Sequence, residues 1–351
     1  MPGLGEAMLL GLGGGIGFMY AVFEYRGHHP MVTVVAQAHP EPIVPAALAR
    51  AGVGHEIRQT GSARVAERNL REVLGSGRAA ICRIGRFALP WRPGPAFPDP
   101  LEVAVTGIDG GEVTVEDACA EPDRLPAGEF MAAWSSLRKG RHHLVAVTGP
   151  ATADPVRAVR GAVEETVARL TGPALGTGFD VNFGLSGMDR LARQLGDAKG
   201  RTGWARRFAD PEAFFTAMTR LHACLENEYT APGATRPLYA DFLDEAAGLL
   251  GGTACGRAAG LYREAGRLWS QVASRAVEPF PRHRALVRER AELLHTRGSR
   301  AADRLRELAG ETAYEMPLDE EGRADLLAEL AGLVAQAVQV EEEAVRALRQ
   351  V

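Results

Sequence analysis

The sequence is poor in cysteine, lysine and long apolar runs, and each scarcity narrows what the protein can be. Its four cysteines stand far apart with no C-x-x-C motif. They therefore show no metal-type spacing, and in a reducing compartment such residues are buried small hydrophobes. Only Lys139 and Lys199 are lysines, which indicates a GC-rich coding sequence. No apolar run approaches the roughly twenty residues that cross a bilayer, and no basic-then-apolar leader is present, so we expect a cytoplasmic protein.

The net charge of the chain is also small. The 351 residues include 40 Lys+Arg and 44 Asp+Glu, which gives a formal charge of −4. This balance lacks the basic footprint of a nucleic-acid-binding protein. Hydrophobic residues make up 46% of the chain, enough for a sizeable core, and the length indicates about two domains. The composition describes a globular protein with no nucleic-acid or membrane partner.

The first 150 residues alternate strand and helix patterns. Short apolar runs predict strands over 31–36, 53–57, 79–84, 102–106 and 113–115. Helical spacing predicts helices over 42–51 and 63–74, with Ser62 as the N-cap of the second. Asp109-Gly110-Gly111 predicts a hairpin turn between the last two strands. These patterns predict a mixed α+β domain over residues 1–150.

From about residue 151 only helical patterns occur. Asp154-Pro155 and Asp210-Pro211 each place an N-cap residue before a proline at the first helical position. Later helices are predicted over 236–247, 261–269, 292–308 with a break near Gly298, and 325–348. In the last of these, Glu341-Glu342-Glu343 indicates a solvated face, with docking to a partner as the alternative. The fold class is therefore α+β, with a helical domain over residues 151–351.

The most unusual stretch lies near the N-terminus. Between Gly5 and Gly17 six of thirteen residues are glycine, and Phe18 and Tyr20 follow. Glycine is costly in ordinary backbone, so such a run indicates turns with φ > 0 or a main chain that approaches a ligand or a helix closely. A dinucleotide fingerprint does not fit, because Ile16 or Phe18 occupies the position of its last glycine and only about ten residues precede the run.

The segment from Glu6 to Phe18, EAMLLGLGGGIGF, resembles the early signature of the butirosin biosynthesis protein H family. Further stretches similar to that family lie at 77–91 (GRAAICRIGRFALPW), 102–109, 113–117, 236–247 and 261–269. The resemblance covers nearly the whole chain and implies a papain-like N-terminal domain packed on a helical C-terminal domain. It also implies transfer of an acyl group from a carrier protein to an aminoglycoside amine.

The resemblance further implies a thiol site, and the chain departs from it. In papain-like enzymes a cysteine on an N-terminal helix attacks the carbonyl, a histidine on the first closing strand activates the thiol, and an Asp or Asn orients the histidine. Here residues 1–5 hold no cysteine, and no histidine occurs between His55 and His142. Asp117 alone is retained, and Cys82 lies in the middle of a strand where we expect it in the core. We therefore expect a degenerate active site.

Other residues offer replacement chemistry. Cys119 with His142 or His143 would form a new thiol–imidazole pair, and the alternative is a loop cysteine beside a strand-edge histidine pair. Glu102 with Asp117 would form a carboxylate pair for acid–base catalysis, because two close carboxylates raise one pKa. The alternative for this pair is two surface carboxylates on neighbouring strands.

We place the candidate site in a groove between the two domains, where clefts form preferentially. The predicted substrate-binding residues belong to the glycine segment and to the helical domain, namely Glu6, Gly13, Gly14, Gly15, Gly17, Tyr20, Arg236 and Tyr239. Glu102 and Asp117 are the predicted catalytic residues. No metal or other cofactor is expected.

The sequence is compatible with two functions. The first is an antibiotic-type, secondary-metabolite biosynthesis enzyme that acts on a small-molecule or carrier-protein-bound acyl substrate. Because it lacks the Cys/His dyad, it would catalyse a modified condensation or acid–base reaction. The second is a non-catalytic binding or scaffold subunit that recognises a carrier protein, a substrate or a partner enzyme. A homodimer is the assembly that we consider for either function.

Overall fold

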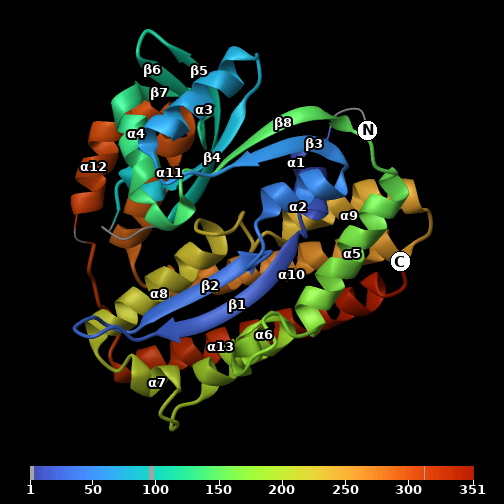
Figure 1. Cartoon of the computed structure of the whole chain (residues 1–351). Helices are drawn as coiled ribbons and strands as arrows, with labels where there is room; N and C mark the ends of the chain where they lie inside the picture. The colour runs from blue at the N-terminus through green and yellow to red at the C-terminus, as the bar shows by residue number, and fades with distance from the viewer. Residues whose placement is uncertain (1–3, 95–98, 312) are drawn as a thin grey trace. The chain divides into compact units, whose positions relative to one another are not determined.

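The computed structural model describes residues 4–94, 99–311 and 313–351. It has the α+β fold that the sequence predicts (Figure 1). In the described part of the chain, no helix combines the length and the hydropathy of a membrane span. Contacts between residues divide the chain into two compact units, which are described separately below.

The two units are interleaved in the sequence. The helical unit consists of Met1–Gly52, Ala151–His283 and Tyr314–Val351, and the sheet unit consists of Val53–Pro150 and Arg284–Ala313. The N-terminal glycine segment therefore belongs with the later helices, and a C-terminal helical segment belongs with the sheet. The division into a papain-like domain over residues 1–150 and a helical domain over residues 151–351 stays a prediction.

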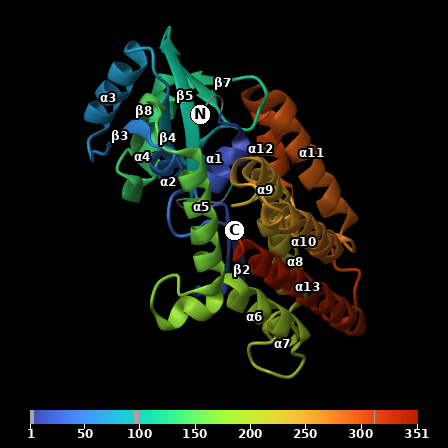
Figure 2. The ribbon, with the colours of Figure 1, turned by 90° about the vertical axis from the view of Figure 1, so that its right-hand side faces the viewer.

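The helical unit surrounds one hairpin. Its elements are α1 (Glu6–Leu12), β1 (Ile16–Phe23), β2 (Met31–Gln37), α2 (Ile43–Arg50), α5 (Pro155–Thr171), α6 (Gly184–Gly196), α7 (Trp204–Arg207), α8 (Pro211–Glu226), α9 (Arg236–Leu250), α10 (Ala254–Val277) and α13 (Glu320–Leu348). Strands β1 and β2 pair antiparallel, with Phe23 opposite Met31. Helix α8 lies against β2 and α6 against β1 (Figure 1), while α9 and α13 both pack on α10 (Figure 2).

Local capping explains where several of these helices begin. The side chains of Asp154, Asp210 and Asp319 accept hydrogen bonds from the backbone N–H groups three residues later. Proline follows Asp154 and Asp210 at the first helical position, where its missing N–H costs no helical hydrogen bond. The two Asp-Pro predictions are therefore confirmed.

The sheet unit contains one six-stranded sheet and the helices that cover it. Its elements are β3 (Val53–Arg58), α3 (Ala63–Gly75), β4 (Ala80–Gly85), β5 (Pro100–Asp109), β6 (Glu112–Glu116), β7 (Asp123–Pro126), α4 (Ala127–Ser136), β8 (Leu144–Ala151) and α12 (Ala302–Gly310). The strand order is β3-β8-β4-β5-β6-β7. Gly110 and Gly111 both have φ > 0 between β5 and β6, which is the backbone that a two-residue hairpin turn requires.

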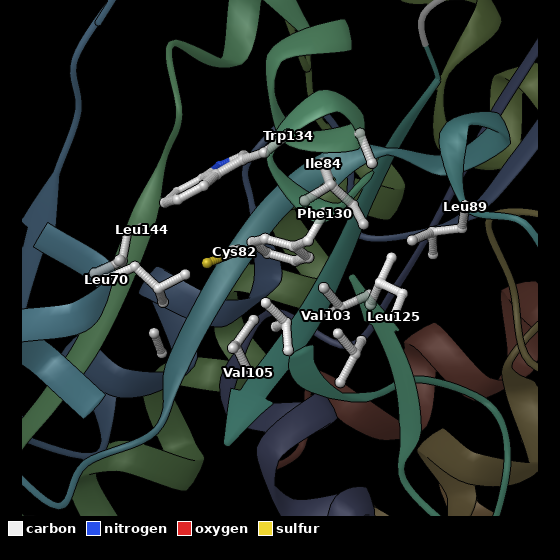
Figure 3. Packing of buried hydrophobic residues seen from close by; sticks show 14 of the residues in the cluster. Leu70, Cys82, Ile84, Leu89, Val103, Val105, Leu125, Phe130, Trp134 and Leu144 are labelled. Atoms are coloured by element: carbon white, nitrogen blue, oxygen red, sulfur yellow. The ribbon is translucent and has the colours of Figure 1, made fainter. Parts of the chain in front are cut away.

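The core of the sheet unit is formed by α3, α4 and the central strands (Figure 3). Alternate residues of β4 face inward, so Ala80, Cys82 and Ile84 are fully buried, as the period of two in a strand dictates. Phe130 and Trp134 of α4 lie beside them in the same core. Cys82 is thus a core residue, as predicted.

Helices α1 and α4 and strands β1 and β7 are among the elements that the sequence patterns do not predict. The glycine-rich sequence does not predict α1 or β1, because glycine is unfavourable in both helices and strands. Elsewhere the predictions hold closely. Ser62 caps α3 through a hydrogen bond from the Val65 N–H, and Gly298, at φ 51, separates α11 (Pro281–Arg297) from α12.

Candidate functional site

The glycine segment is the junction at which α1 ends and β1 begins. The Gly14 N–H donates to the Gly11 carbonyl at 3.0 Å, and the Gly15 N–H donates to the Leu10 carbonyl at 2.9 Å. With Gly14 at φ 99, these two bonds form a Schellman motif, a common way to end a helix. The N–H groups that a phosphate cradle would present are thus occupied by the helix end. The order helix–glycine–strand is also the reverse of a dinucleotide fingerprint.

The glycines allow side chains from neighbouring helices to approach the backbone. A Cβ placed on Gly11 would lie 2.2 Å from the Phe242 ring, and one on Gly15 would lie 2.4 Å from the Tyr239 ring. At Gly13 the nearest atom belongs to Ile43, at 2.4 Å. Such distances are far below ordinary contact, so these positions accept only glycine without rearrangement. The observed contacts of the segment are packing contacts, and a role in substrate binding stays a prediction.

The carbonyl oxygens of the junction face cations. The Gly14 carbonyl accepts from Arg169 Nη1 at 2.7 Å and from Thr166 Oγ1 at 3.0 Å. Arg50 donates to the Leu12 carbonyl, and the Glu165 carboxylate pairs with both arginines. These bonds satisfy the carbonyl groups that a helix leaves without partners at its C-terminus. The junction is therefore held rigidly within the helical unit.

Tyr20 and Glu6 have contrasting surroundings. The Tyr20 hydroxyl donates to Gln194 Oε1 at 2.7 Å and accepts from Trp204 Nε1 at 2.8 Å. Burial raises the pKa of Tyr20 to about 12, so the phenol stays protonated at neutral pH. Glu6 is exposed in the first turn of α1, where a carboxylate stabilises the helix N-terminus.

Arg236 and Tyr239 lie inside the helical unit. Arg236 is fully buried, and its Nε donates to Glu341 Oε1 at 2.5 Å. The same carboxylate oxygen accepts from Trp269 Nε1 at 2.9 Å. The Tyr239 ring meets the Tyr262 ring edge-on at 5.2 Å, and burial raises the pKa of Tyr239. The segment that opens α9 therefore builds a polar cluster in the core.

Glu341 corrects the prediction for the last helix. The sequence predicts a solvated face there, yet the Glu341 side chain is 0% exposed and is paired with Arg236. A buried charge of this kind must be paired and hydrogen-bonded, and Arg236 and Trp269 supply such contacts to Oε1 of Glu341. The charge run alone gave no sign of it, because its neighbours Glu342 and Glu343 are exposed.

Glu102 and Asp117 are each bound by a different arginine of the sheet unit. Glu102 lies opposite Arg83 in the β4–β5 register and accepts from its Nη2 at 3.0 Å. Asp117 accepts from Nε and Nη2 of Arg92 at 2.5 and 2.7 Å, and from Trp91 Nε1 at 2.9 Å. Both carboxylates thus have cationic partners within their own unit. Their pairing as an acid–base couple stays a prediction.

The predicted site residues are divided between the units. Arg236, Tyr239, Tyr20, Glu6 and the glycines belong to the helical unit, whereas Glu102 and Asp117 belong to the sheet unit. Each set is well ordered by its own contacts. The groove that would join the two sets remains a prediction.

The cysteines are poor nucleophiles where they are buried. Cys82, Cys224 and Cys255 are buried, and burial raises the pKa of each thiol. A raised pKa reduces the thiolate, which is the reactive form. Cys119 is half-buried between β6 and β7, where the neighbouring Ala118 carbonyl contacts His295 Nδ1 at 3.0 Å.

His142 does not offer a free nitrogen to Cys119. Its Nδ1 lies 2.9 Å from the Thr60 carbonyl oxygen, and its Nε2 lies 2.9 Å from Ser135 Oγ. Both ring nitrogens of His142 are thus engaged, by Thr60 and by Ser135, and the pairing of Cys119 with His143 stays a prediction. Sequence reasoning missed Ser135 because no motif marks it, and only the fold of α4 brings it to the histidine. The hydrogen-bonded pair is the arrangement in the described residues that most resembles a nucleophile and its base.

Metal chemistry has no visible site here. Within residues 4–94, 99–311 and 313–351, no group of three or more His, Cys, Asp or Glu side chains is placed to hold a metal ion.

Comparison with known proteins divides the sequence into two matched segments. Residues 1–118 match the family model described as butirosin biosynthesis protein H, N-terminal. Residues 131–296 match a model described as a domain of unknown function (DUF4872). No curated protein matches the chain. The first match covers α1, β1 and the sheet up to β6, and the second covers the segment from α4 to α11.

Proposed function

Because the chain belongs to the butirosin biosynthesis protein H family, we propose that it acts in antibiotic-type biosynthesis on an activated acyl substrate. The substrate would be a small thioester or an acyl group carried by a carrier protein. The reaction would be a transfer or condensation that does not use a cysteine thiolate.

The state of the thiols carries this proposal. Papain-like acyl transfer needs a thiolate beside an imidazole. Three of the four cysteines are buried with raised pKa values, and His142, one of the two histidines considered as a partner for Cys119, is bonded to Ser135 and Thr60. With the residues of the given sequence, an oxygen nucleophile or simple positioning would take the place of the sulfur.

A second function is supported by a different observation. Arg236, Tyr20, Glu102 and Asp117 are all engaged in contacts within their own units. Side chains engaged in such contacts stabilise the fold and have few hydrogen-bonding groups left to bind a substrate. That pattern favours a binding or scaffold subunit that recognises an acylated carrier or a partner enzyme without turning it over.

Thioester cleavage separates the two functions. The purified chain would be mixed with acetyl-N-acetylcysteamine thioester and an aminoglycoside acceptor, and the released thiol followed against a blank without thioester. We expect release in the wild type and in Cys119→Ala at rates within about twofold of each other, since no thiolate takes part. A loss of roughly tenfold or more in Cys119→Ala would contradict the proposal. Binding without release would favour the scaffold function, and neither binding nor release would reject both.

A further inference from the structure

Ser135 and His142 form a directed hydrogen bond at the end of α4. The Thr60 carbonyl can only accept, so His142 Nδ1, at 2.9 Å, carries the proton in the neutral imidazole. His142 Nε2 then has a lone pair, and Ser135 Oγ, also at 2.9 Å, donates its hydrogen to it. A hydroxyl that donates to a histidine oriented by a third group is the arrangement of a nucleophile, its base and an orienting residue.

The backbone that presents His142 is strained. Arg141 and His142 have φ of 48° and 47°, a region that residues other than glycine adopt at an energetic cost. Two consecutive residues of this kind persist only where the surroundings fix them. The Thr60 N–H donates to the Arg141 carbonyl at 2.8 Å. Thr60 therefore fixes the turn through both its N–H and its carbonyl group. In this turn the imidazole lies within hydrogen-bonding distance of Ser135.

The surroundings favour proton transfer to the imidazole. Ser135 lies in the last turn of α4 (Ala127–Ser136), and the C-terminal end of a helix carries a partial negative charge that stabilises a nearby cation. The Trp134 ring meets the His142 ring edge-on at 5.4 Å and fixes its plane. Ser135 is half-buried and His142 is 8% exposed. Access from solvent is therefore through the serine.

We propose that Ser135 is an acyl-accepting nucleophile and that His142 is its general base; this rests on the proposed acyl chemistry. In the first step, Ser135 Oγ forms a bond to the acyl carbon and the bond to the leaving thiol breaks. The hydroxyl proton passes to His142 Nε2 and then to the departing thiolate. In the second step, an amine or water attacks the ester, its proton passes through the same nitrogen, and Ser135 Oγ takes it back.

The acyl donor is expected to carry negative charge. Arg138, Lys139 and Arg141 are exposed within four residues of each other, in the turn between Ser135 and His142. Three exposed cations in this turn would attract a phosphate-bearing thioester by their field. The substrate class is therefore an acyl thioester of an anionic carrier.

A fluorophosphonate probe tests the pair on the intact chain. We expect one probe molecule per protein on Ser135, located by peptide mass analysis, in the wild type and in the matched control Ser136→Ala. Ser135→Ala should lose the label. His142→Asn keeps a residue that tolerates positive φ and should label roughly 100-fold more slowly. Circular dichroism confirms that each variant is folded.

The outcomes distinguish this inference from the proposed function. Wild-type protein that resists the probe, or label on a residue other than Ser135, overturns the dyad whatever the variants do. Thioester cleavage that survives in Ser135→Ala also overturns the dyad but leaves the proposed function intact. Labelling of Ser135 without any thioester cleavage supports the dyad and rejects the proposed acyl chemistry.

Discussion

At the scale of single residues, Gly11 shows how close packing requires glycine in this segment. Adding one methyl group there would place it 2.2 Å from the Phe242 ring. Because buried atoms are packed near crystal density, neighbouring groups would have to shift. The cause is contact with α9, since Gly11 itself lies within α1 and needs no positive φ.

We predict that Gly11→Ala lowers the free energy of unfolding by about 1–3 kcal/mol, the usual cost of overpacking. The matched control is Gly248→Ala in α9, where nothing lies within 4 Å of the added Cβ. That control should gain about 0.5–1 kcal/mol, because alanine is the better helix former. Urea unfolding of both variants measures the difference. Equal effects at the two positions would contradict the packing account.

Asp123 adds a prediction about pH. Its carboxylate is 2% exposed, and Oδ1 accepts from the Ser299 N–H at 2.6 Å. Burial raises the pKa of Asp123 above its ordinary value of 3.8. The folded state then binds the proton before the unfolded state does, so this group adds stability as pH falls from neutral towards 3.8.

The test compares wild type with Asp123→Asn, which does not titrate. The free energy of unfolding of the wild type should rise relative to the variant as pH is lowered through that window. Urea unfolding at several pH values gives the difference. A difference that is independent of pH, or that changes in the opposite sense, would show that Asp123 does not titrate in this way.

At the scale of elements, the Arg236–Glu341 pair joins α9 to α13. Both side chains are 0% exposed. Removing one partner leaves the other charge buried without a counter-ion, which costs about 3–5 kcal/mol, whereas apolar replacement of both is often neutral. The pair is therefore a buried salt bridge that links two helices far apart in the sequence.

We predict that Arg236→Met destabilises the protein by about 3–5 kcal/mol and that Arg236→Met with Glu341→Leu recovers most of the loss. The control is Arg193→Met, which breaks an exposed pair with Asp189 and should cost no more than about 1 kcal/mol. Thermal unfolding followed by circular dichroism is sufficient. Should the double variant be as unstable as the single one, the buried charge would not be the cause.

The elements that the sequence revealed are those with local signals. Helix starts are predicted by N-cap side chains, namely Ser62, Asp154 and Asp210. The hairpin turn is predicted by Gly110 and Gly111, whose backbones can adopt positive φ. The burial of Glu341 had no local signal, since it depends on Arg236 more than a hundred residues away. The Ser135–His142 pair was missed for the same reason: it depends on how α4 and the turn at residue 141 are folded together.

At the scale of the whole molecule, the interleaving of the two units predicts which fragments of the chain can fold on their own. Residues 53–150 share their core with Ala301 and Leu305 of the later segment, and residues 1–52 belong with the helical unit. A cut at residue 150 would therefore divide both units. Sequence alone could not show this, because it reflects contacts between distant segments and not any local pattern.

We expect residues 1–150 alone to lack a cooperative unfolding transition and a near-ultraviolet dichroism signal. The matched fragment joins residues 53–150 to 284–313 through a short Gly/Ser linker and holds the whole sheet unit. That fragment should unfold cooperatively, as a unit with its own core does. A sharp transition for residues 1–150 would contradict the division into units.

One measurement addresses the central claim, that an acyl group passes through an oxygen of this fold and not through sulfur. Cys119→Ala protein would be mixed with excess acetyl-N-acetylcysteamine thioester and an amine, quenched within the first turnover, and analysed by peptide mass spectrometry. The account predicts an acetyl ester on Ser135 that appears before the product and is absent in Ser135→Ala. An acetyl group on any other residue, or product formed at an unchanged rate by Ser135→Ala, would contradict it.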